Sequence, residues 1–279
     1  MNTLAPASTA GSVPRLTGAF AGFEQRLAWA GLAILALMAP TALALAVDPR
    51  SLNGIPIWIK PLKFQASVGI YLLTLAWFVA ALPERVRQGR IVGALVAAAI
   101  AASAFEIGYI TLQAARGLAS HYKVDDPFHA AMYTLMGIGA VTLTAVSPAV
   151  AALLWRHRPA RWSTAFWVSA VLGLTLTFVL GAGAGAVLSS GDGHWIGGVR
   201  SDAGGVPVFG WSRTGGDLRA AHFLGMHALH GLPVIGFMAG RLLPAGKAIG
   251  AVVMATAAYC AVTGVVFWLA VSGIPLFPA

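Results

Sequence analysis

Charged residues are what this sequence has least of. Only 10% of its 279 residues are Asp, Glu, Lys or Arg, whereas about 25% is usual in soluble domains. Hydrophobic residues make up 58%, and the mean hydropathy is +0.79. A soluble fold of this length could not bury so much apolar surface. The composition therefore excludes a soluble globular protein and predicts a chain that faces lipid.

Cysteine is almost absent as well. The single cysteine, Cys260, falls inside the last apolar stretch, so neither an intramolecular disulfide nor a site built from several cysteines can form. The net charge of +9 would suggest nucleic-acid binding in a soluble protein. Here the positive residues stand in short clusters between apolar stretches. Membrane topology explains such clusters, and we expect no nucleic-acid partner.

Seven apolar stretches are near the roughly 20 residues that a helix needs to cross a bilayer. Backbone groups in lipid must pair within their own segment, so the stretches are helices. The sequence predicts an all-α, polytopic bundle of about seven transmembrane helices over residues 23–279. Residues 1–22, rich in Ala, Ser, Thr, Gly and Pro, are expected to form a disordered tail. The expected spans are Leu27–Val47, Phe64–Leu82, Ile91–Ala115, Ala130–Trp155, Ser163–Ser189, Ala220–Gly240 and Ala248–Gly273.

The first span resembles a signal peptide at one point, because Ala44-Leu45-Ala46 has the pattern of a cleavage site. Its apolar stretch is 21 residues long, however, and the apolar core of a signal peptide has about 7–15. We therefore expect this segment to be retained as a membrane span.

Basic residues predict that the amino terminus is cytoplasmic. One side of the predicted topology carries the terminus and the loops after the second, fourth and sixth spans. It holds ten basic and two acidic residues, a net charge of +8, whereas the opposite side holds eight and six, a net charge of +2. Cytoplasmic loops carry the excess of Lys and Arg, so the first side is assigned to the cytoplasm.

Two further features concern the outer side and the packing of the fifth span. The longest loop, at residues 190–219, has 30 residues, nine of them glycine. It also contains His194, Trp195 and Trp211, and we expect an ordered cap rather than a linker. Gly181 and Gly185 form a small-xxx-small pair, which favours close packing of the fifth span against a neighbouring helix.

Glu106 is the only formally charged residue inside an expected span. It lies nine residues from the outer end of the third span, which is about 13 Å at 1.5 Å per residue. A carboxylate at this depth is unfavourable by at least a few kcal/mol unless it is neutral or partnered. It is either a protonated, hydrogen-bonded side chain or a functional group. In the second case it is a metal ligand, a proton carrier, a partner of a quinone or other substrate, or a catalytic group.

The sixth span contains three histidines on one broad face. His222, His227 and His230 lie within about 140° on a helical wheel and extend about 12 Å along the axis. Asp217 precedes them as a helix N-cap and a candidate catalytic carboxylate. Each histidine alone could be a neutral core residue. Three on one face favour a metal site, in which Glu106 would join His222 and His227.

A haem is the alternative cofactor. Haem b is usually held between transmembrane helices by axial histidines, and the spacings of five and three residues do not match a metal pair on one helix. His129 begins the fourth span on the outer side. It could bracket a haem with His222 or share a metal with it, and His227 is a further candidate ligand. His121, in the preceding loop, is interpreted as a surface or cap residue that could also close over a site.

Lys60 and Lys63 begin the second span on the outer side, against the overall distribution of positive charge. They are either interfacial anchors or, with Arg219, a cationic clamp. Such a clamp would neutralise nearby carboxylates or bind an anionic substrate.

Several motifs together resemble those of a group of bacterial inner-membrane proteins without an assigned activity. They are the stretch Lys60–Phe64, the stretch Gln113–Gly117 followed by Ser120-His121, and Trp211-Ser212 with Gly216–Arg219, His222-Phe223 and His227-Ala228. The resemblance covers about residues 50–240 and implies location in the bacterial inner membrane. In this group the position of His230 is often Gln, which shifts the expected ligand role to His222 and His227.

Three functions remain open, besides a purely structural or assembly role. The first is a haem- or metal-dependent membrane oxidoreductase with a small-molecule or quinone substrate. The second is a proton-coupled or small-molecule transporter, since intramembrane Glu and His suit proton relays. The third is a membrane hydrolase that uses Asp217, His222 and the cationic clamp.

Overall fold

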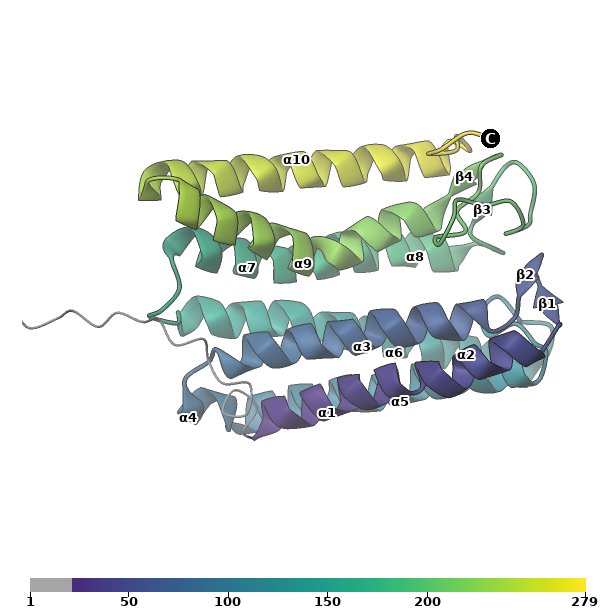
Figure 1. The fold of residues 1–279 in the computed structure, drawn as a ribbon, viewed down its shortest axis with the longest axis horizontal. Helices are drawn as coiled ribbons and strands as arrows, with labels where there is room; N and C mark the ends of the chain where they lie inside the picture. The colour runs from purple at the N-terminus through teal and green to yellow at the C-terminus, as the bar shows by residue number, and fades with distance from the viewer. Residues whose placement is uncertain (1–21) are drawn as a thin grey trace, which may run out of the picture.

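Within residues 22–279, seven helical spans run side by side and are long and apolar enough to cross a membrane (Figure 1), which confirms the expected fold class. The computed structural model describes residues 22–279. The tail expected at residues 1–22 lies, apart from Gly22, outside the described residues. The observed spans differ from the expected ends by at most five residues. They are Phe23–Val47, Ile59–Ala80, Arg90–Ala115, Pro127–Arg156, Thr164–Ser190, Leu218–Leu242 and Ala245–Val271.

The secondary-structure elements follow these spans, with short strands confined to the loops at one end. The helices of the first four spans are α1 (Phe23–Ala36), α2 (Met38–Val47), α3 (Ile59–Ala80), α5 (Arg90–Ala115) and α6 (Pro127–Arg156), with the short α4 (Glu84–Arg87) between them. The last three spans are α7 (Thr164–Leu176), the π-helical segment η2 (Thr177–Ala182) and α8 (Gly183–Ser190), then α9 (Leu218–Leu242) and α10 (Ala245–Val271). Strands β1 (Ser51–Leu52) and β2 (Ile55–Pro56) form one hairpin, and β3 (Trp195–Ile196) pairs with β4 (Gly216–Asp217).

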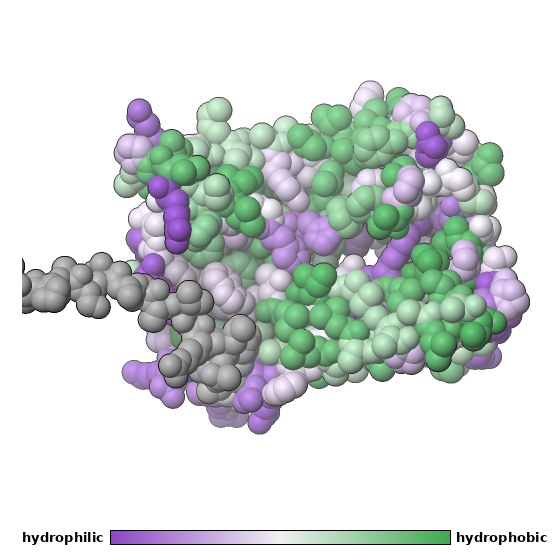
Figure 2. All heavy atoms as spheres, viewed as in Figure 1, coloured by the Kyte–Doolittle hydropathy of each residue, from purple (hydrophilic) through white to green (hydrophobic). Residues whose placement is uncertain are grey.

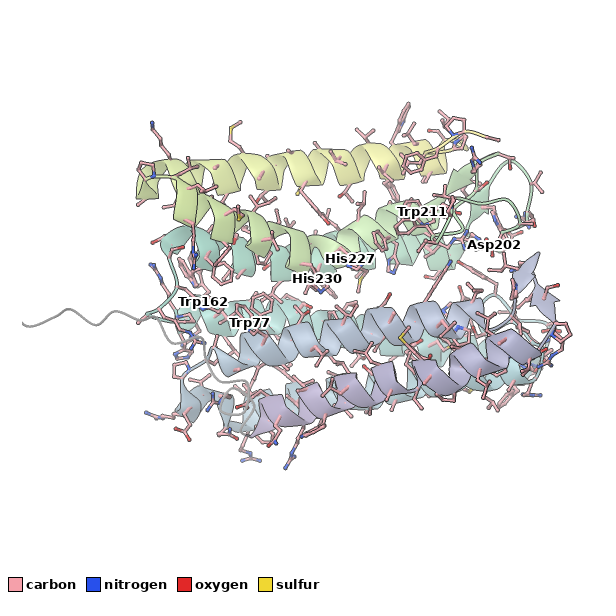
Figure 3. All side chains as sticks on the ribbon, in the orientation of Figure 1. Trp77, Trp162, Asp202, Trp211, His227 and His230 are labelled. Atoms are coloured by element: carbon pink, nitrogen blue, oxygen red, sulfur yellow. The ribbon has the colours of Figure 1, made fainter. Side chains whose placement is uncertain are left out.

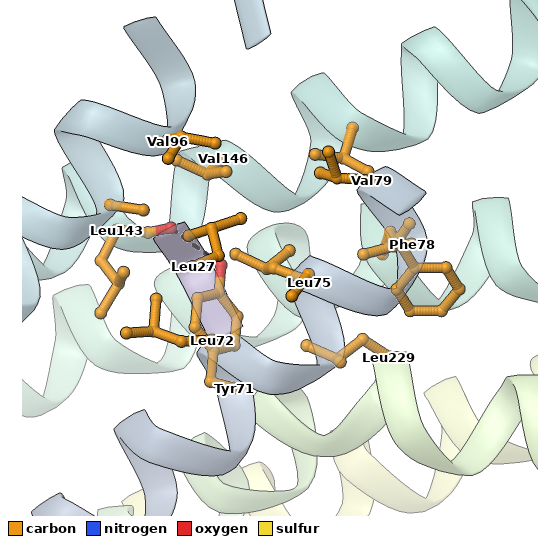
Figure 4. Close-up of a cluster of buried hydrophobic side chains, with 14 of the residues drawn as sticks. Leu27, Tyr71, Leu72, Leu75, Phe78, Val79, Val96, Leu143, Val146 and Leu229 are labelled. Atoms are coloured by element: carbon orange, nitrogen blue, oxygen red, sulfur yellow. Dashed lines mark hydrogen bonds between the residues drawn. The ribbon is translucent and has the colours of Figure 1, made fainter. Parts of the chain in front are cut away.

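The helices form two halves, which Figure 1 shows as separate layers. Helices α1, α2, α3, α5 and α6 pack together, and α7, η2, α8, α9 and α10 form the second group, joined to the first mainly where α6 packs against α7 and η2. The larger apolar core lies in the first half, around Leu72, Leu75 and Phe78 of α3 (Figure 4). Leu229 of α9 is also part of this core and links the two halves.

Proline and glycine explain the local form of the first span. It is interrupted at Leu37, between α1 and α2. Pro40 has no N–H to donate to the carbonyl of Ala36, where α1 ends, and its ring crowds that carbonyl. Gly31 of α1 and Gly69 of α3 approach so closely that a Cβ on Gly31 would lie 2.9 Å from the Gly69 carbonyl oxygen. This contact packs the first span against the bundle.

Large apolar side chains cover the sides of the bundle. Trp29, Met254 and Trp268 are 63%, 73% and 59% exposed, and Figure 2 shows green, hydrophobic residues along much of the visible side. Such a surface is unfavourable in water and favourable against lipid. The chain is a multi-pass membrane protein.

The long loop between α8 and α9 is folded over one end of the bundle. Its ends pair through β3 and β4, and its middle is tied to the first hairpin, because the backbone N–H of Asp202 donates to the carbonyl of Asn53 at 2.8 Å. His194 and Asp202 are buried within it. We call residues 191–217 the cap.

Candidate functional site

A polar slot separates the two halves on the face shown in Figure 2. The space-filling view shows this side hollowed between α9 and α3, with hydrophilic side chains in the hollow. His227 and His230 of α9 lie on the side of that helix that faces α3 (Figure 3). The view is perpendicular to the helices, so the slot opens towards the side of the bundle, where the bilayer would lie.

Aromatic side chains close the slot at the end far from the cap. Trp77 of α3 stacks on Trp162, with ring centroids 5.5 Å apart, and both rings lie near His230 in the view of Figure 3. Phe166 of α7 packs edge-on against Trp162 at 4.9 Å. This aromatic plug leaves the slot open towards the cap and the side of the bundle.

Lys60 and His121 meet in the half of the slot nearest the cap. The Lys60 ammonium lies 3.0 Å from Nδ1 of His121, and the Ser120 hydroxyl lies 3.1 Å from the same nitrogen. An ammonium can only donate, so Nδ1 of His121 accepts. Burial lowers the pKa of His121 well below its usual 6.5, and the positive charge of Lys60 lowers it further. His121 is therefore a neutral ring with its proton on Nε2.

Glu106 belongs to the same region. It is 5% exposed and packs so closely on α6 that a Cβ on Gly139 would lie 2.9 Å from its Oε1. That oxygen has no hydrogen-bond partner among the described residues. Lys60 is its electrostatic partner. A buried carboxyl oxygen without a hydrogen-bond partner is unfavourable. Proteins retain such unpaired polar atoms mainly at functional sites, so Glu106 is a candidate functional group.

Arg219 joins the cap to the start of α9. Its guanidinium donates to Asp217 at 2.7 and 2.9 Å, to Asp202 at 2.8 Å and to the Gly210 carbonyl at 2.6 Å. Burial alone would raise the pKa of Asp202, but the hydrogen bond from His194 and the charge of Arg219 outweigh it, so this pKa is lowered. The network holds Asp202 as an anion and fixes the cap over the slot.

Asp217 is the N-cap of α9, as the sequence predicts. Its Oδ1 accepts from the backbone N–H and from Nε of Arg219, and its Oδ2 accepts from the Ser212 N–H and from Nη2 of Arg219. Four donors occupy both carboxylate oxygens. We therefore assign Asp217 to positioning Arg219 and the cap, and give it no proton-transfer role.

The histidines of α9 are held in defined tautomers by their neighbours. Thr74 uses its single hydroxyl proton on the Ile70 carbonyl at 2.8 Å, so it must accept from Nε2 of His230, 3.0 Å away. The Nδ1 of His230 then accepts from Nδ1 of His227, at 3.2 Å. A neutral imidazole carries one N–H. His227 therefore presents an unprotonated Nε2.

His222 shows the same arrangement through a different partner. Its Nδ1 lies 2.9 Å from the Gly181 carbonyl of η2, which can only accept. Nε2 of a neutral His222 is therefore unprotonated, and no other described residue bonds it. A histidine that donates Nδ1–H to a backbone carbonyl and leaves Nε2 free is the usual form of a metal ligand.

The π-helical segment explains why Gly181 is within reach of His222. A Cβ on Gly225 of α9 would lie 2.5 Å from the Gly181 nitrogen, so the two helices touch through glycine. Gly185 likewise faces the His222 ring. Thr177 of η2 accepts from the Leu229 N–H at 2.9 Å. The packing expected for Gly181 and Gly185 is confirmed, and α9 is the partner helix.

His129 has a separate set of neighbours. It contacts Asp126, whose carboxylate caps α6 and accepts from its Nδ1, and Phe128. Ligand atoms of Asp125, Asp126 and His129 lie within 4.8 Å of one another. Asp125 is exposed and already paired with Lys123 at 2.6 Å. We therefore interpret this group as the N-terminal capping structure of α6 and not as a metal site.

The residues predicted from sequence thus fall into three groups. Lys60, Glu106 and Arg219 lie with Lys63 near the cap, His222 and His227 lie further along α9, and His129 stands apart. The sequence did not indicate Asp202 or Thr74 as members of the site. For His121 it indicated a surface or cap residue that could close over a site. Nothing in the local sequence marks Thr74, whose role depends on α9 lying opposite.

No protein-family model, curated protein or solved structure matches this chain.

Proposed function

We propose that this chain is a multi-pass protein of the bacterial inner membrane, with its amino terminus in the cytoplasm and the cap on the outer side. The distribution of Lys and Arg supports this orientation. The functional site would be the polar slot between α3 and α9. Polar and ionisable groups inside a bilayer are energetically unfavourable, and they are retained mainly at functional sites. The aromatic plug of Trp77 and Trp162 argues against a continuous path to the cytoplasm, and thus against a transporter.

We further propose that the slot carries a haem or a divalent metal, with His222 or His227 of α9 as one of its ligands, and catalyses a redox reaction on a small molecule such as a quinone. The observation behind this proposal is the pair of unprotonated Nε2 atoms on one helix, each fixed by a bond at the opposite ring nitrogen. A bound haem iron or metal would supply electron transfer. The chain would orient the rings through Gly181 and His230, and Glu106 would hold or release a proton beside Lys60.

The test is the absorption spectrum and metal content of protein purified in detergent. We expect a Soret band, or a metal present in stoichiometric amount, in the wild type. At least one of the variants His222→Ala and His227→Ala should remove the signal. His157→Ala is the matched control, because His157 ends α6 at the opposite side of the bundle and should leave the signal unchanged. A folded protein that is colourless and free of metal would contradict the proposal.

A further inference from the structure

Two lysines face the slot without a paired anion. Lys60 and Lys63 lie three residues apart on α3, so they share one face of the helix. The nearest polar partners are neutral. They are the His121 ring for Lys60, at 3.0 Å, and the Phe209 carbonyl for Lys63, at 2.9 Å. Within residues 22–279 neither ammonium has a carboxylate within ion-pair distance.

The carboxylates nearest these lysines are already engaged. Asp202 and Asp217 are both paired with Arg219, at 2.8 and 2.7 Å. Glu106 acts on Lys60 electrostatically but makes no hydrogen bond to it. An ammonium inside a membrane is unfavourable unless an anion accompanies it. Each ammonium also has three N–H donors, and one protein contact leaves two of them for a ligand.

The surroundings of the two lysines are apolar and aromatic. The ring of Phe64 lies beneath Lys60, 5.8 Å from its Nζ. Across the slot, Phe223 of α9 contacts Phe209 at 5.2 Å and His227 at 4.1 Å. From Lys60 to Thr74 the slot extends 14 residues along α3, or about 21 Å. It therefore offers positive charge at one end and a long, mostly apolar wall beside it.

We propose that the slot binds an amphiphile with an anionic, oxygen-bearing headgroup, which enters sideways from the bilayer. The headgroup binds Lys60 and Lys63 beneath the cap, and the apolar body lies along α3 and α9. This inference rests on the proposed function, since it names the substrate class of the same slot, and it favours an anionic amphiphile over a neutral quinone. Arg219 holds the cap in place and is not the headgroup ligand.

The experiment compares lipids as stabilisers of the purified protein. We expect phosphatidylglycerol to raise the midpoint of thermal unfolding by about 5 °C more than phosphatidylcholine does. Inorganic phosphate, the soluble probe of the same chemistry, should give little of this effect. The double variant Lys60→Met/Lys63→Met should lose the preference, and Lys60→Arg/Lys63→Arg should keep most of it. Lys123→Met is the control, because Lys123 lies in a loop at the same end and is paired with Asp125.

Three outcomes would overturn the inference. They are equal stabilisation of the wild type by both lipids, an equal effect of inorganic phosphate, and loss of the preference in Lys123→Met. The wild-type comparison is informative even if the double methionine variant does not fold. His222→Ala should keep the lipid preference, so absence of a cofactor and absence of an anionic ligand give different results.

Discussion

The histidines of this protein differ in whether Nδ1 donates or accepts a hydrogen bond within the fold. His222, His227 and His129 each donate through Nδ1, to a carbonyl, a second imidazole and a carboxylate respectively. His121 instead accepts at Nδ1 from Lys60. Since a metal binds an unprotonated nitrogen, the rings of His222 and His227 are suited to ligation at Nε2, and His121 is suited to donate a proton there.

The buried, neutral state of His121 predicts a pH dependence of stability. The pKa of His121 is lowered in the folded protein, so between that value and its usual 6.5 the unfolded chain binds more protons. The free energy of unfolding therefore falls as the pH falls through this window. We expect thermal unfolding of the wild type to shift down more between pH 6.5 and 5 than that of His121→Asn. Equal shifts in the two proteins would contradict a neutral His121.

The crossing of η2 and α9 is the element that positions the histidines. At this crossing Gly225 meets Gly181, and the π-helical turn brings the Gly181 carbonyl to His222. Single π turns are frequent at functional sites. The sequence predicts only part of this arrangement. The small-xxx-small pattern indicates close packing at Gly181, but a π turn leaves no mark in hydrophobic periodicity, and the identity of the partner helix depends on the fold.

A methyl group at this crossing should destabilise the protein. Ala at position 225 would place Cβ 2.5 Å from a backbone nitrogen, and overpacking of this kind is unfavourable by about 1–3 kcal/mol. We expect Gly225→Ala to lower the midpoint of thermal unfolding and to weaken the cofactor signal. Gly264→Ala is the matched control, because Gly264 lies within α10 with no atom within 4 Å of the added Cβ. A Gly225→Ala protein as stable as this control would refute the close contact.

At the scale of the whole molecule, the spans were predictable from sequence and the slot was not. Length and hydropathy define each helix, and Asp126, Ser163 and Asp217 mark three of the starts as N-caps. Hydropathy does not predict which helix faces pack together and which face each other across the slot. Thr74 and His230 are 156 residues apart in the chain and bond across the slot, whereas α9 packs tightly on α7 and α10. The division into two halves therefore depends on contacts between helices that are far apart in the sequence.

The orientation of the two halves in the membrane is testable with one engineered cysteine at a time. Cys260 is the single native cysteine, so Cys260→Ala provides a background without thiols. Val124 lies in the loop between α5 and α6 and is 59% exposed, whereas a Cβ at Gly246, where α10 begins, meets no atom within 4 Å. With net charges of +8 and +2 at the two ends, the positive-inside rule places residue 246 in the cytoplasm.

A membrane-impermeant maleimide should label Val124→Cys in intact cells, and Gly246→Cys only after the cells are permeabilised. The reverse pattern would turn the cap and the lysines of the slot towards the cytoplasm, and an anionic amphiphile would then have to come from the inner leaflet.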